Sequence, residues 1–397
     1  MTEERPTTVL VDVAVPVPLD QTFTYRWEPP AAAAEAGPAR RAARRGAKAR
    51  AAGAVEPAAA EAAPAPSPPA PPRRGDLVEV PFGRRRRVIG LVVGSRETDR
   101  PDQEADGHAI RAVSSVLPPA YALAPDRLAL AEWLAGYYAL PLGEVVPLFH
   151  PPAPGTRRRE ARAEGPAYPL RDADPADIVP TASQREAEAV ALGHLERGEY
   201  GAILLHGITG SGKTEVYLRV IAAALARGRS AIFLLPEIAL TPQTIARIAQ
   251  RFGGEVAAIH SGLSAGERCR VHEAAAAGQL RVVVGPRSAL FAPVRDLGVV
   301  VVDEEHETSY KQEETPRYHA RHAALMRARL AGAVALLGSA TPDLESYRNG
   351  SAGRYRLITL ADRPVGELPA VEIVDMRGEP APEGFSARLV ERLDAEK

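Results

Sequence analysis

The stretch AILLHGITGSGKTEVYLRV, residues 202–220, decides the fold class of this 397-residue chain. An apolar run comes first, then a glycine-rich segment, then an amphipathic helical pattern. Gly207, Gly212, Lys213 and Thr214 fit the pattern G-x-x-x-x-G-K-[ST], whose backbone N–H groups converge on phosphate oxygens at the start of a helix. The sequence therefore predicts a nucleotide site between a buried strand and a helix. The other residues of the predicted loop are Thr209, Gly210 and Ser211.

Further apolar runs surround this segment at regular intervals. They are AIFLLPE, VAAIH, RVVVG, LGVVVVDEE and AVALLGSA, and amphipathic helical stretches separate them. Near-continuous apolar strands that alternate with helices are typical of a parallel sheet with helices on both faces. Because ligands of such sheets bind at the carboxyl ends of the strands, we expect the functional residues to gather at that edge.

Two acids end one of these runs, VVVVDEEH at residues 299–306. Asp303 suits the holding of Mg²⁺ through water, and Glu304 is placed to orient and deprotonate an attacking water. Alone, such acids are as often solvated loop residues, but their position after a phosphate-binding loop favours the catalytic interpretation. Asp303, Glu304 and Lys213 are therefore the candidate catalytic residues, and Thr214 joins Asp303 as a candidate Mg²⁺ ligand.

Two weaker motifs belong to the same part of the chain. In LLGSATPDLES, the hydroxyls of Ser339 and Thr341 can relay nucleotide state by hydrogen bonds, although the segment taken alone is only a helix cap. In TASQ, the Gln184 amide can pair with an adenine edge, and a helix cap by Thr181 is an equally plausible interpretation.

Composition narrows the classes of protein. Net charge is −1, from 49 basic and 50 acidic side chains, so overall charge does not indicate a polyanionic partner. Four lysines stand beside 45 arginines, and one of the four is Lys213. The single cysteine, Cys269, excludes an intramolecular disulfide and a multi-cysteine zinc site within these residues. With no apolar run of 18 residues and an acidic, proline-interrupted start, the sequence predicts a cytoplasmic protein without a membrane segment.

Shifts in composition divide the chain into expected domains. Strand-like runs on both sides of an Ala/Pro/Arg-rich stretch indicate one small β-rich domain, and the stretch itself is interpreted as a disordered insertion. Leu128, Trp133, Leu134 and Tyr137 recur at helical spacing and indicate a short accessory domain. The expected boundaries are 1–105 for the β-rich domain, 29–74 for the insertion, 110–168 for the accessory domain, 169–180 for a linker, 181–362 for the nucleotide-binding domain and 363–397 for the start of a further part.

Several blocks together resemble a known family. GITGSGKTEVY, LLPEIALTPQ, HSGLSAGER, GPRSALFAPVRDLGVVVVDEEHETSYKQEETPRYHARH and LGSATPDLES are similar to the first helicase lobe of the PriA (primosomal protein N′) family of bacterial replication-restart helicases, in helicase superfamily 2. VAVPVPLDQTFTY and VEVPFGRRRRVIGLVVG resemble that family's DNA 3′-end-binding domain, and LAEWLAGYYALPLGEV resembles its winged-helix region. The resemblance implies an α/β fold with a RecA-like first lobe, preceded by a β-rich DNA-binding domain and a winged-helix-like domain.

The resemblance also implies an activity. It is that of a DNA-stimulated ATPase and 3′→5′ DNA helicase that uses ATP and Mg²⁺, recognises stalled forks and restarts replication. The implied partners are single-stranded and forked DNA, primosome and replication-restart proteins, single-strand-binding protein and the replicative helicase loader, in the nucleoid-associated cytoplasm. Two alternatives stay open: a catalytically silent module that binds forks and nucleates the primosome, and another superfamily 2 nuclease or remodeller subunit.

Carried over by position, the resemblance assigns roles to individual residues. Gln184 would sit near adenine, His306 would link hydrolysis to DNA, and Ser339 with Thr341 would transmit it. ETSYKQEETPRYHAR resembles an aromatic-rich loop that couples single-strand binding to ATP hydrolysis, in which tyrosines offer stacking faces and basic residues offer phosphate contacts. The candidate DNA contacts are Tyr310, Lys311, Arg317, Tyr318 and Arg321 in this loop, together with Phe23, Thr24, Tyr25, Arg84, Arg287 and the loop around Ser261.

The sequence departs from the family pattern at three places, one of which is the insertion at 29–74 between expected strands. Family members continue into a second lobe that carries a cysteine-rich zinc module and an arginine finger, whereas this sequence ends at Lys397. We therefore expect this chain alone to bind nucleotide weakly and hydrolyse it slowly, since an arginine finger contributes about 10³–10⁵ in rate in phosphate-loop enzymes. Thr24 stands where many members have an acid that helps recognise a 3′-hydroxyl end, so the sequence does not predict 3′-end specificity.

Overall fold

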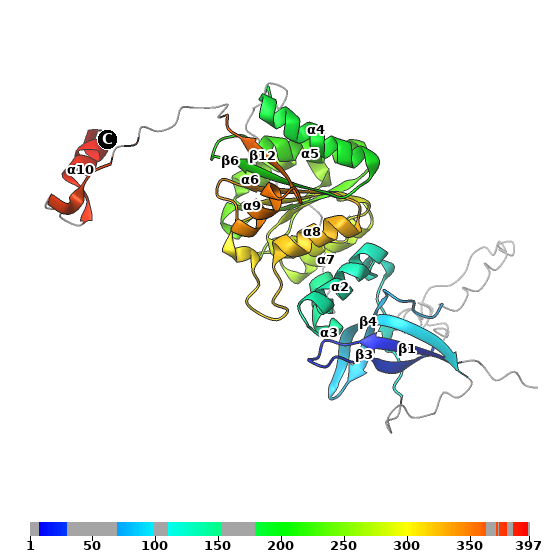
Figure 1. Cartoon of the computed structure of the whole chain (residues 1–397). Helices are drawn as coiled ribbons and strands as arrows, with labels where there is room; N and C mark the ends of the chain where they lie inside the picture. Colours follow the sequence, from blue (N-terminus) through cyan, green and yellow to red (C-terminus); the bar gives the residue numbers. More distant parts are fainter. Residues whose placement is uncertain are drawn as a thin grey trace, which may run out of the picture.

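The computed structural model describes residues 8–29, 70–98, 110–151, 179–362, 371, 373–378 and 384–395. These residues form a small antiparallel sheet, a short helical segment and a larger parallel sheet with helices on both faces (Figure 1). The insertion predicted at 29–74 and the linker predicted at 169–180 lie almost wholly outside the described residues, so both stay predictions.

The small sheet is antiparallel, with the strand order β2-β1-β4-β3-β5. Val11 and Val13 of β1 pack with Val78 and Val80 of β3 in one fully buried cluster, because alternate residues of each strand share one face. The β-rich character predicted for this part of the chain is confirmed. Its strands are β1 (Thr8–Ala14), β2 (Phe23–Trp27), β3 (Leu77–Phe82), β4 (Arg85–Thr98) and β5 (Ser115–Val116).

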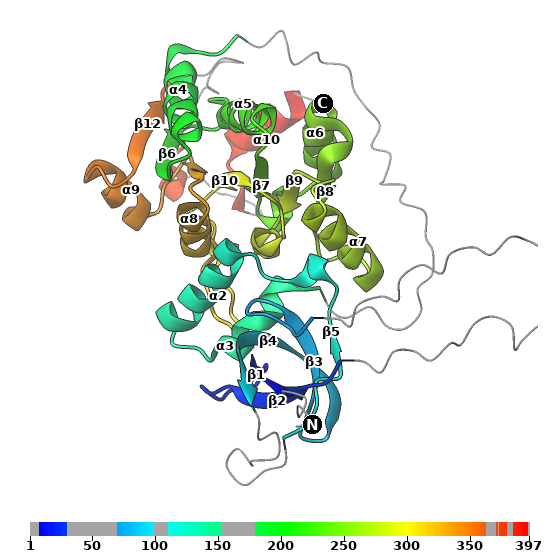
Figure 2. The ribbon, with the colours of Figure 1, turned by 90° about the vertical axis from the view of Figure 1, so that its right-hand side faces the viewer.

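A helical segment joins the small sheet to the larger one (Figure 2). Leu130 and Leu134 of α2 share a buried cluster with Ala323 and Ala324 of α8, so the segment packs directly on the helices of the larger sheet. Its elements are η1 (Pro119–Tyr121), α2 (Pro125–Tyr137), α3 (Leu142–Val145) and η2 (Val146–Phe149), and α8 spans Ala320–Leu330.

The larger sheet has seven parallel strands in the order β12-β6-β11-β10-β7-β9-β8. All six apolar runs read as strands from the sequence form strands here, and the parallel pairing is confirmed. The sequence reading missed β12, whose exposed Arg356 and Thr359 break the apolar pattern. The strands are β6 (Gly201–Gly207), β7 (Ser230–Leu234), β8 (Val256–Ala258), β9 (Val282–Gly285), β10 (Leu297–Asp303), β11 (Val334–Ser339) and β12 (Arg356–Leu360).

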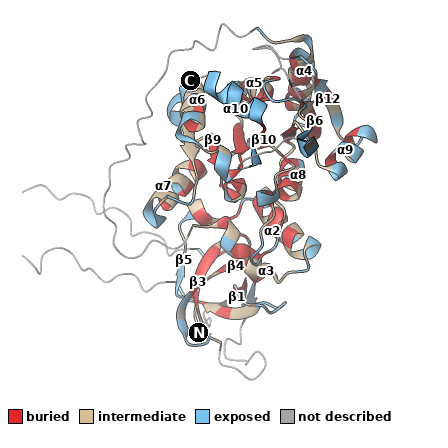
Figure 3. Ribbon diagram, turned by 90° about the vertical axis from the view of Figure 1, so that its left-hand side faces the viewer, coloured by how far each residue is buried: buried red, intermediate tan, exposed pale blue. Residues whose placement is uncertain are grey.

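Helices cover both faces of this sheet, as predicted. Successive strand residues alternate between two buried clusters: Ile203 packs with α4 and α5, whereas Leu204 packs on the side of α8. Burial is concentrated in the central strands and falls off toward α7 and α10 (Figure 3). The remaining helices are α4 (Ala182–Arg197), α5 (Lys213–Ala226), α6 (Pro242–Phe252), α7 (Ala265–Ala276), α9 (Leu344–Ser351) and α10 (Ala387–Ala395).

Within the described residues, no helix has both the length and the apolar character that crossing a bilayer requires.

Candidate functional site

The predicted phosphate-binding loop connects β6 to α5. Gly212 adopts a left-handed conformation (φ 80°) and occupies the N-cap position of α5. Because glycine has no side chain, no side-chain hydrogen bond caps the N-terminus of this helix. The Lys213 ammonium is buried and donates a 2.7 Å hydrogen bond to the Gly207 carbonyl at the start of the loop. The loop is therefore closed on itself through the one lysine that the motif requires.

The acidic strand end lies at the same edge of the sheet as this loop. β11 lies between β6 and β10, so the three strands that carry the predicted motifs end side by side. Tyr217, one turn after Lys213 on α5, donates a 3.1 Å hydrogen bond to Oδ1 of Asp303. The phosphate-binding helix and the acidic strand are thus in direct contact.

Asp303 carries a strongly perturbed carboxyl group. Burial is the main cause that raises its pKa to about 6, and the neighbouring Glu304 adds to the rise, while Tyr217 and Lys213 oppose it. With this pKa, the carboxylate takes up a proton when the pH falls only slightly below neutral. A divalent cation would stabilise the charged form, which suits the proposed Mg²⁺ role.

Glu304, His306, Ser339 and Thr341 form one connected chain of groups. Glu304 lies in a tight turn with a positive φ of 45°, and its Oε2 is 3.6 Å from Nδ1 of His306. The same His306 nitrogen lies 2.7 Å from Oγ of Ser339, which also accepts a 2.9 Å hydrogen bond from the Thr341 N–H. The structure therefore brings together the predicted hydrolysis and coupling residues.

Gln184 lies against the phosphate-binding loop. Its side chain completes a capping box with Thr181, and Nε2 donates a 2.8 Å hydrogen bond to the Ser211 carbonyl. The geometry supports the capping interpretation of TASQ, and Gln184 also contacts the phosphate-binding loop. The adenine contact stays a prediction.

The residues present fit a Mg²⁺-nucleotide. Among the described residues, Ser211 has a buried hydroxyl without a hydrogen-bond partner, and it lies within the loop. Backbone N–H groups at the start of α5, together with the Lys213 ammonium, suit phosphate oxygens. Thr214 and Asp303 supply the oxygen donors that Mg²⁺ prefers.

Glu305 is the site residue that sequence reasoning missed. It is fully buried, and its carboxylate accepts hydrogen bonds from Arg321, from the backbone N–H of Asp343 and from the Ser346 hydroxyl. Its own N–H donates to the Gly338 carbonyl of β11. The sequence contains one indication of this role: Glu305 is the third acid in a row at the end of a buried strand. A buried carboxylate requires a charged or hydrogen-bonding partner.

The stacking role predicted for Tyr310 and Tyr318 is wrong for this structure. Each side chain is only 1% exposed, so neither ring offers a face to a base. The Tyr310 hydroxyl donates to the Asp303 carbonyl at 2.7 Å, and the Tyr318 ring packs edge-on against Phe291. Both aromatic rings of the 307–319 loop belong to the hydrophobic core. They share a buried cluster with residues of β10 and η6 (Arg287–Phe291).

The basic residues of this region differ in burial and in their partners. Arg321 is 4% exposed and binds Glu305, Asp343 and Glu345, so the predicted phosphate contact is wrong for it. Arg317 is exposed and stays a candidate. The others are partly buried or backbone-bound: Lys311 Nζ donates to the Arg317 carbonyl at 3.1 Å, and Arg287 Nη1 donates to the Ser309 and Lys311 carbonyls at 2.9 and 3.2 Å. Ser261 is exposed, as a DNA contact requires.

The small sheet holds the other predicted DNA contacts. Tyr25 is 4% exposed and its hydroxyl donates to the Pro81 carbonyl, so its ring belongs to the core and is not a DNA-facing surface. Phe23 is partly exposed and packs edge-on against Phe82. Thr24 donates a 2.7 Å hydrogen bond to Asp12, and Arg84 is exposed in the turn between β3 and β4.

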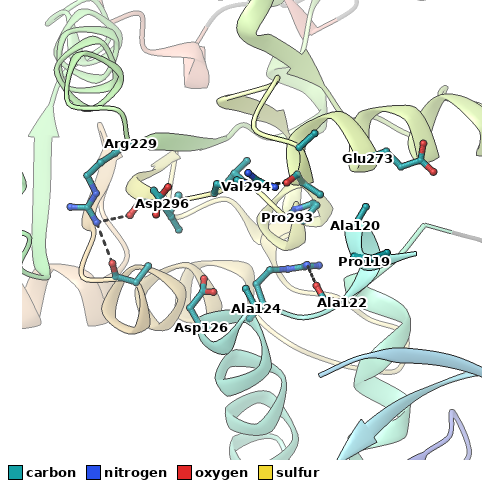
Figure 4. Close-up of a pocket in the computed structure, with 16 residues that line it drawn as sticks. Pro119, Ala120, Ala122, Ala124, Asp126, Arg229, Glu273, Pro293, Val294 and Asp296 are labelled. Carbon is teal, nitrogen blue, oxygen red and sulfur yellow. Dashed lines mark hydrogen bonds between the residues drawn. The ribbon is translucent and has the colours of Figure 1, made fainter. Parts of the chain in front are cut away.

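A separate cavity of about 720 Å³ lies at the opposite, amino-terminal edge of the parallel strands. Its walls come from the start of α2, the end of α7 and the segment before β10 (Figure 4). The buried Arg127 of its lining donates to the carbonyls of Phe149 and Phe291, which ties the helical segment to the larger sheet.

The sequence of the chain matches two family models. Residues 181–349 match the DEAD/DEAH box helicase family, and residues 62–151 match the 3′DNA-binding domain (3′BD). The parallel sheet, the phosphate-binding loop and the acidic strand end all lie in or beside the segment that is similar to the DEAD/DEAH box helicase family.

The curated proteins most useful for comparison carry one name, replication restart protein PriA. The chain is 33% identical over 393 residues to replication restart protein PriA of Treponema pallidum, which covers 96% of this chain and 51% of that protein. It is 48% identical over 218 residues to replication restart protein PriA of Bacillus subtilis, covering 54% of this chain and 27% of that protein. The chain is similar to replication restart protein PriA of these organisms, and it spans at most about half the length of these curated relatives.

One solved structure that partly resembles this chain is the structure of RecG bound to a three-way DNA junction. It is 23% identical, with a TM-score of 0.36, over 48% of this chain and 24% of that chain.

Proposed function

We propose that this chain is the ATP-binding and DNA-binding part of a 3′→5′ DNA helicase that acts in replication restart. The observation that carries the proposal is the contact between Tyr217 and Asp303, because it joins the phosphate-binding helix to the acidic strand end. The similarity to PriA supports the assignment to restart of replication.

The residues of the site divide the work of ATP hydrolysis. Lys213 and the backbone of residues 207–212 bind and orient the phosphates, while Thr214 and Asp303 hold Mg²⁺. Bound Mg²⁺ supplies charge that stabilises the phosphoryl oxygens during transfer. Glu304 orients the attacking water and accepts its proton, and the contact of His306 with Ser339 carries the state of the site to the segment before α9.

DNA binding in this proposal involves both sheets. Exposed Arg84 and Arg317, with the partly exposed Phe23 and Thr24, are the candidate contacts. Single-stranded and forked DNA are the proposed nucleic-acid partners. Primosome and replication-restart proteins, single-strand-binding protein and the helicase loader are the proposed protein partners, in the cytoplasm near the nucleoid. Zinc is proposed only for the cysteine-rich module that the resemblance places in longer proteins of the PriA family.

Nucleotide binding by a Lys213 variant tests the proposal. We expect Lys213→Ala to weaken binding of a fluorescent, non-hydrolysable ATP analogue with Mg²⁺ by about tenfold or more, since a buried, charge-assisted contact is lost. Arg197→Ala removes an exposed basic side chain that pairs with Glu199 at the end of α4, and we expect it to bind the analogue like wild type. Equal binding by the wild type and Lys213→Ala would contradict the proposed nucleotide site.

A further inference from the structure

Glu305 joins three separate segments through one carboxylate. Oε2 accepts hydrogen bonds from Arg321 Nη1 at 2.8 Å and from the Ser346 hydroxyl at 2.7 Å. Oε1 accepts the N–H of Asp343 at 2.8 Å. The carboxylate is fully buried, so these protein groups replace all of its contact with water. Glu305 thus connects the end of β10 to α8 and to the start of α9.

Arg321 places this connection at the end of the 307–319 loop. It lies in the first turn of α8, and the loop runs directly into that helix. Its guanidinium also lies 3.3 Å from Asp343 and 3.3 Å from Glu345, so three carboxylates share one arginine. His322 adds a 3.2 Å contact to Glu345. Because three carboxylates share the one guanidinium of Arg321, any movement of Arg321 changes the ion pairs of all three at once.

Glu305 is also adjacent in the sequence to the residues assigned to hydrolysis and coupling. It follows Glu304 and precedes His306, and its N–H holds the Gly338 carbonyl one residue before Ser339. Glu304 already occupies an unfavourable positive φ, so its conformation depends on the contacts that hold the turn. A displacement of Glu305 therefore moves Glu304 and His306 with it.

We propose that Glu305 is a positioning residue that links the 307–319 loop, through Arg321, to the orientation of Glu304 and His306. The proposal rests on the proposed function, since it assigns the route by which DNA contact at the loop reaches the nucleotide site. In this route the loop needs no exposed tyrosine: DNA that contacts the exposed Arg317 moves the loop, and Arg321 transfers the movement to Glu305.

Coupled binding of two ligands tests this route in the full chain. The affinity for the fluorescent ATP analogue is measured with and without single-stranded DNA, and the DNA affinity with and without the analogue. We expect each ligand to change the affinity for the other by the same factor, about fivefold or more in the wild type, because coupling is reciprocal. Glu305→Gln keeps the shape but replaces one accepting oxygen with a donor, and we expect its coupling factor to fall below about twofold.

Further variants separate positioning from folding. Arg321→Lys keeps the charge but loses the forked geometry, so we expect a coupling factor between those of wild type and Glu305→Gln, with each single-ligand affinity within about threefold of wild type. Glu255→Gln is the matched control, because Glu255 pairs with Arg281 at 2.7 Å at a distant edge of the same sheet. We expect that control to retain wild-type coupling, and thermal melting checks that every variant folds.

The possible outcomes distinguish this inference from the proposed function. Coupling in Glu305→Gln and Arg321→Lys equal to that of wild type overturns the inference and leaves the nucleotide site in place. Binding of both ligands by the wild type without any coupling also overturns it. Failure of the wild type to bind the Mg²⁺-nucleotide overturns the proposed function itself.

Discussion

The hydroxyl of Tyr217 and the carboxylate of Asp303 lie 3.1 Å apart, which locks the phosphate-binding helix to the acidic end of β10. The neighbouring strand makes room for this contact. A side chain at Gly338 of β11 would collide with the Tyr217 hydroxyl, so only glycine allows the tyrosine to reach across β11. Tyr217 is fully buried, and its position is therefore fixed by packing as well as by the hydrogen bond.

Removal of the Tyr217 hydroxyl should shift the pH dependence of nucleotide binding. The hydrogen bond from Tyr217 lowers the pKa of Asp303, which burial raises to about 6. In Tyr217→Phe that opposing effect is lost, so the pKa of Asp303 rises further and Mg²⁺-nucleotide binding should fail at a higher pH than in wild type. Titration of analogue affinity between pH 5 and pH 8 measures the midpoint. Tyr200→Phe, a partly buried tyrosine far from the site, should leave the midpoint unchanged; the same midpoint in both variants would refute the assignment.

Asp303 should reduce the stability of the chain at neutral pH. Its pKa rises from 3.8 to about 6 on folding, so the folded state holds a proton that the unfolded state releases, and stability falls as pH increases through this window. Asp303→Asn removes the charge, and we expect it to stabilise the nucleotide-free chain by about 1–3 kcal/mol at pH 7 and to abolish Mg²⁺-nucleotide binding. Urea unfolding at pH 4 and pH 7 measures the effect. A gain of equal size at both values would contradict the linkage.

The parts of the fold that follow from glycine positions and from the pattern of apolar residues could be predicted from the sequence. The apolar runs predicted the parallel sheet, and the phosphate-binding pattern identified the loop from Gly207 to Thr214, because glycine positions and strand order leave few alternatives. Sequence reasoning failed for β12, where Arg356 and Thr359 face outward at the edge of the sheet. An edge strand covered on one side lacks the continuous apolar run that a central strand shows.

Side-chain direction was the second limit. Tyr310, Tyr318 and Arg321 have the residue types of a single-strand-binding loop, yet packing buries all three. Nothing in the spacing of ETSYKQEETPRYHAR states which residues face the core, since the loop lacks a regular period. The role of Glu305 could not be predicted for a related reason. Its partners Arg321 and Ser346 follow it by 16 and 41 residues, and only the fold brings them together.

Truncation of Tyr318 should primarily unfold the chain. The ring is buried against Phe291, at 5.2 Å between ring centres, so Tyr318→Ala should reduce the free energy of unfolding by about 3 kcal/mol or more. Tyr347→Ala on α9 removes a ring that is 45% exposed and should cost less than about 1 kcal/mol. Urea unfolding measures both, and an effect of Tyr318→Ala on single-stranded DNA affinity without loss of stability would show that the ring is exposed after all.

The contact between Thr24 and Asp12 should restore recognition of a 3′-hydroxyl end. Thr24 stands where the resemblance implies an acid in many members of the PriA family. Asp12 is its partner on the neighbouring strand, and the Asp12 carboxylate accepts a hydrogen bond from the Thr24 hydroxyl at 2.7 Å. Arg96 holds the other oxygen at 2.7 Å, and the side chain of Asp12 is still 27% exposed. A carboxylate is therefore present beside position 24, and it can accept a hydrogen bond from a hydroxyl while repelling a phosphate. We expect the wild type to bind forks with a 3′-hydroxyl more tightly than forks with a 3′-phosphate, and Asp12→Asn to lose most of this preference. Asp20→Asn changes an exposed acid of the same region and should keep the preference. Fluorescence anisotropy with the two forks measures it, and an unchanged ratio in Asp12→Asn would show that Asp12 does not read the 3′ end.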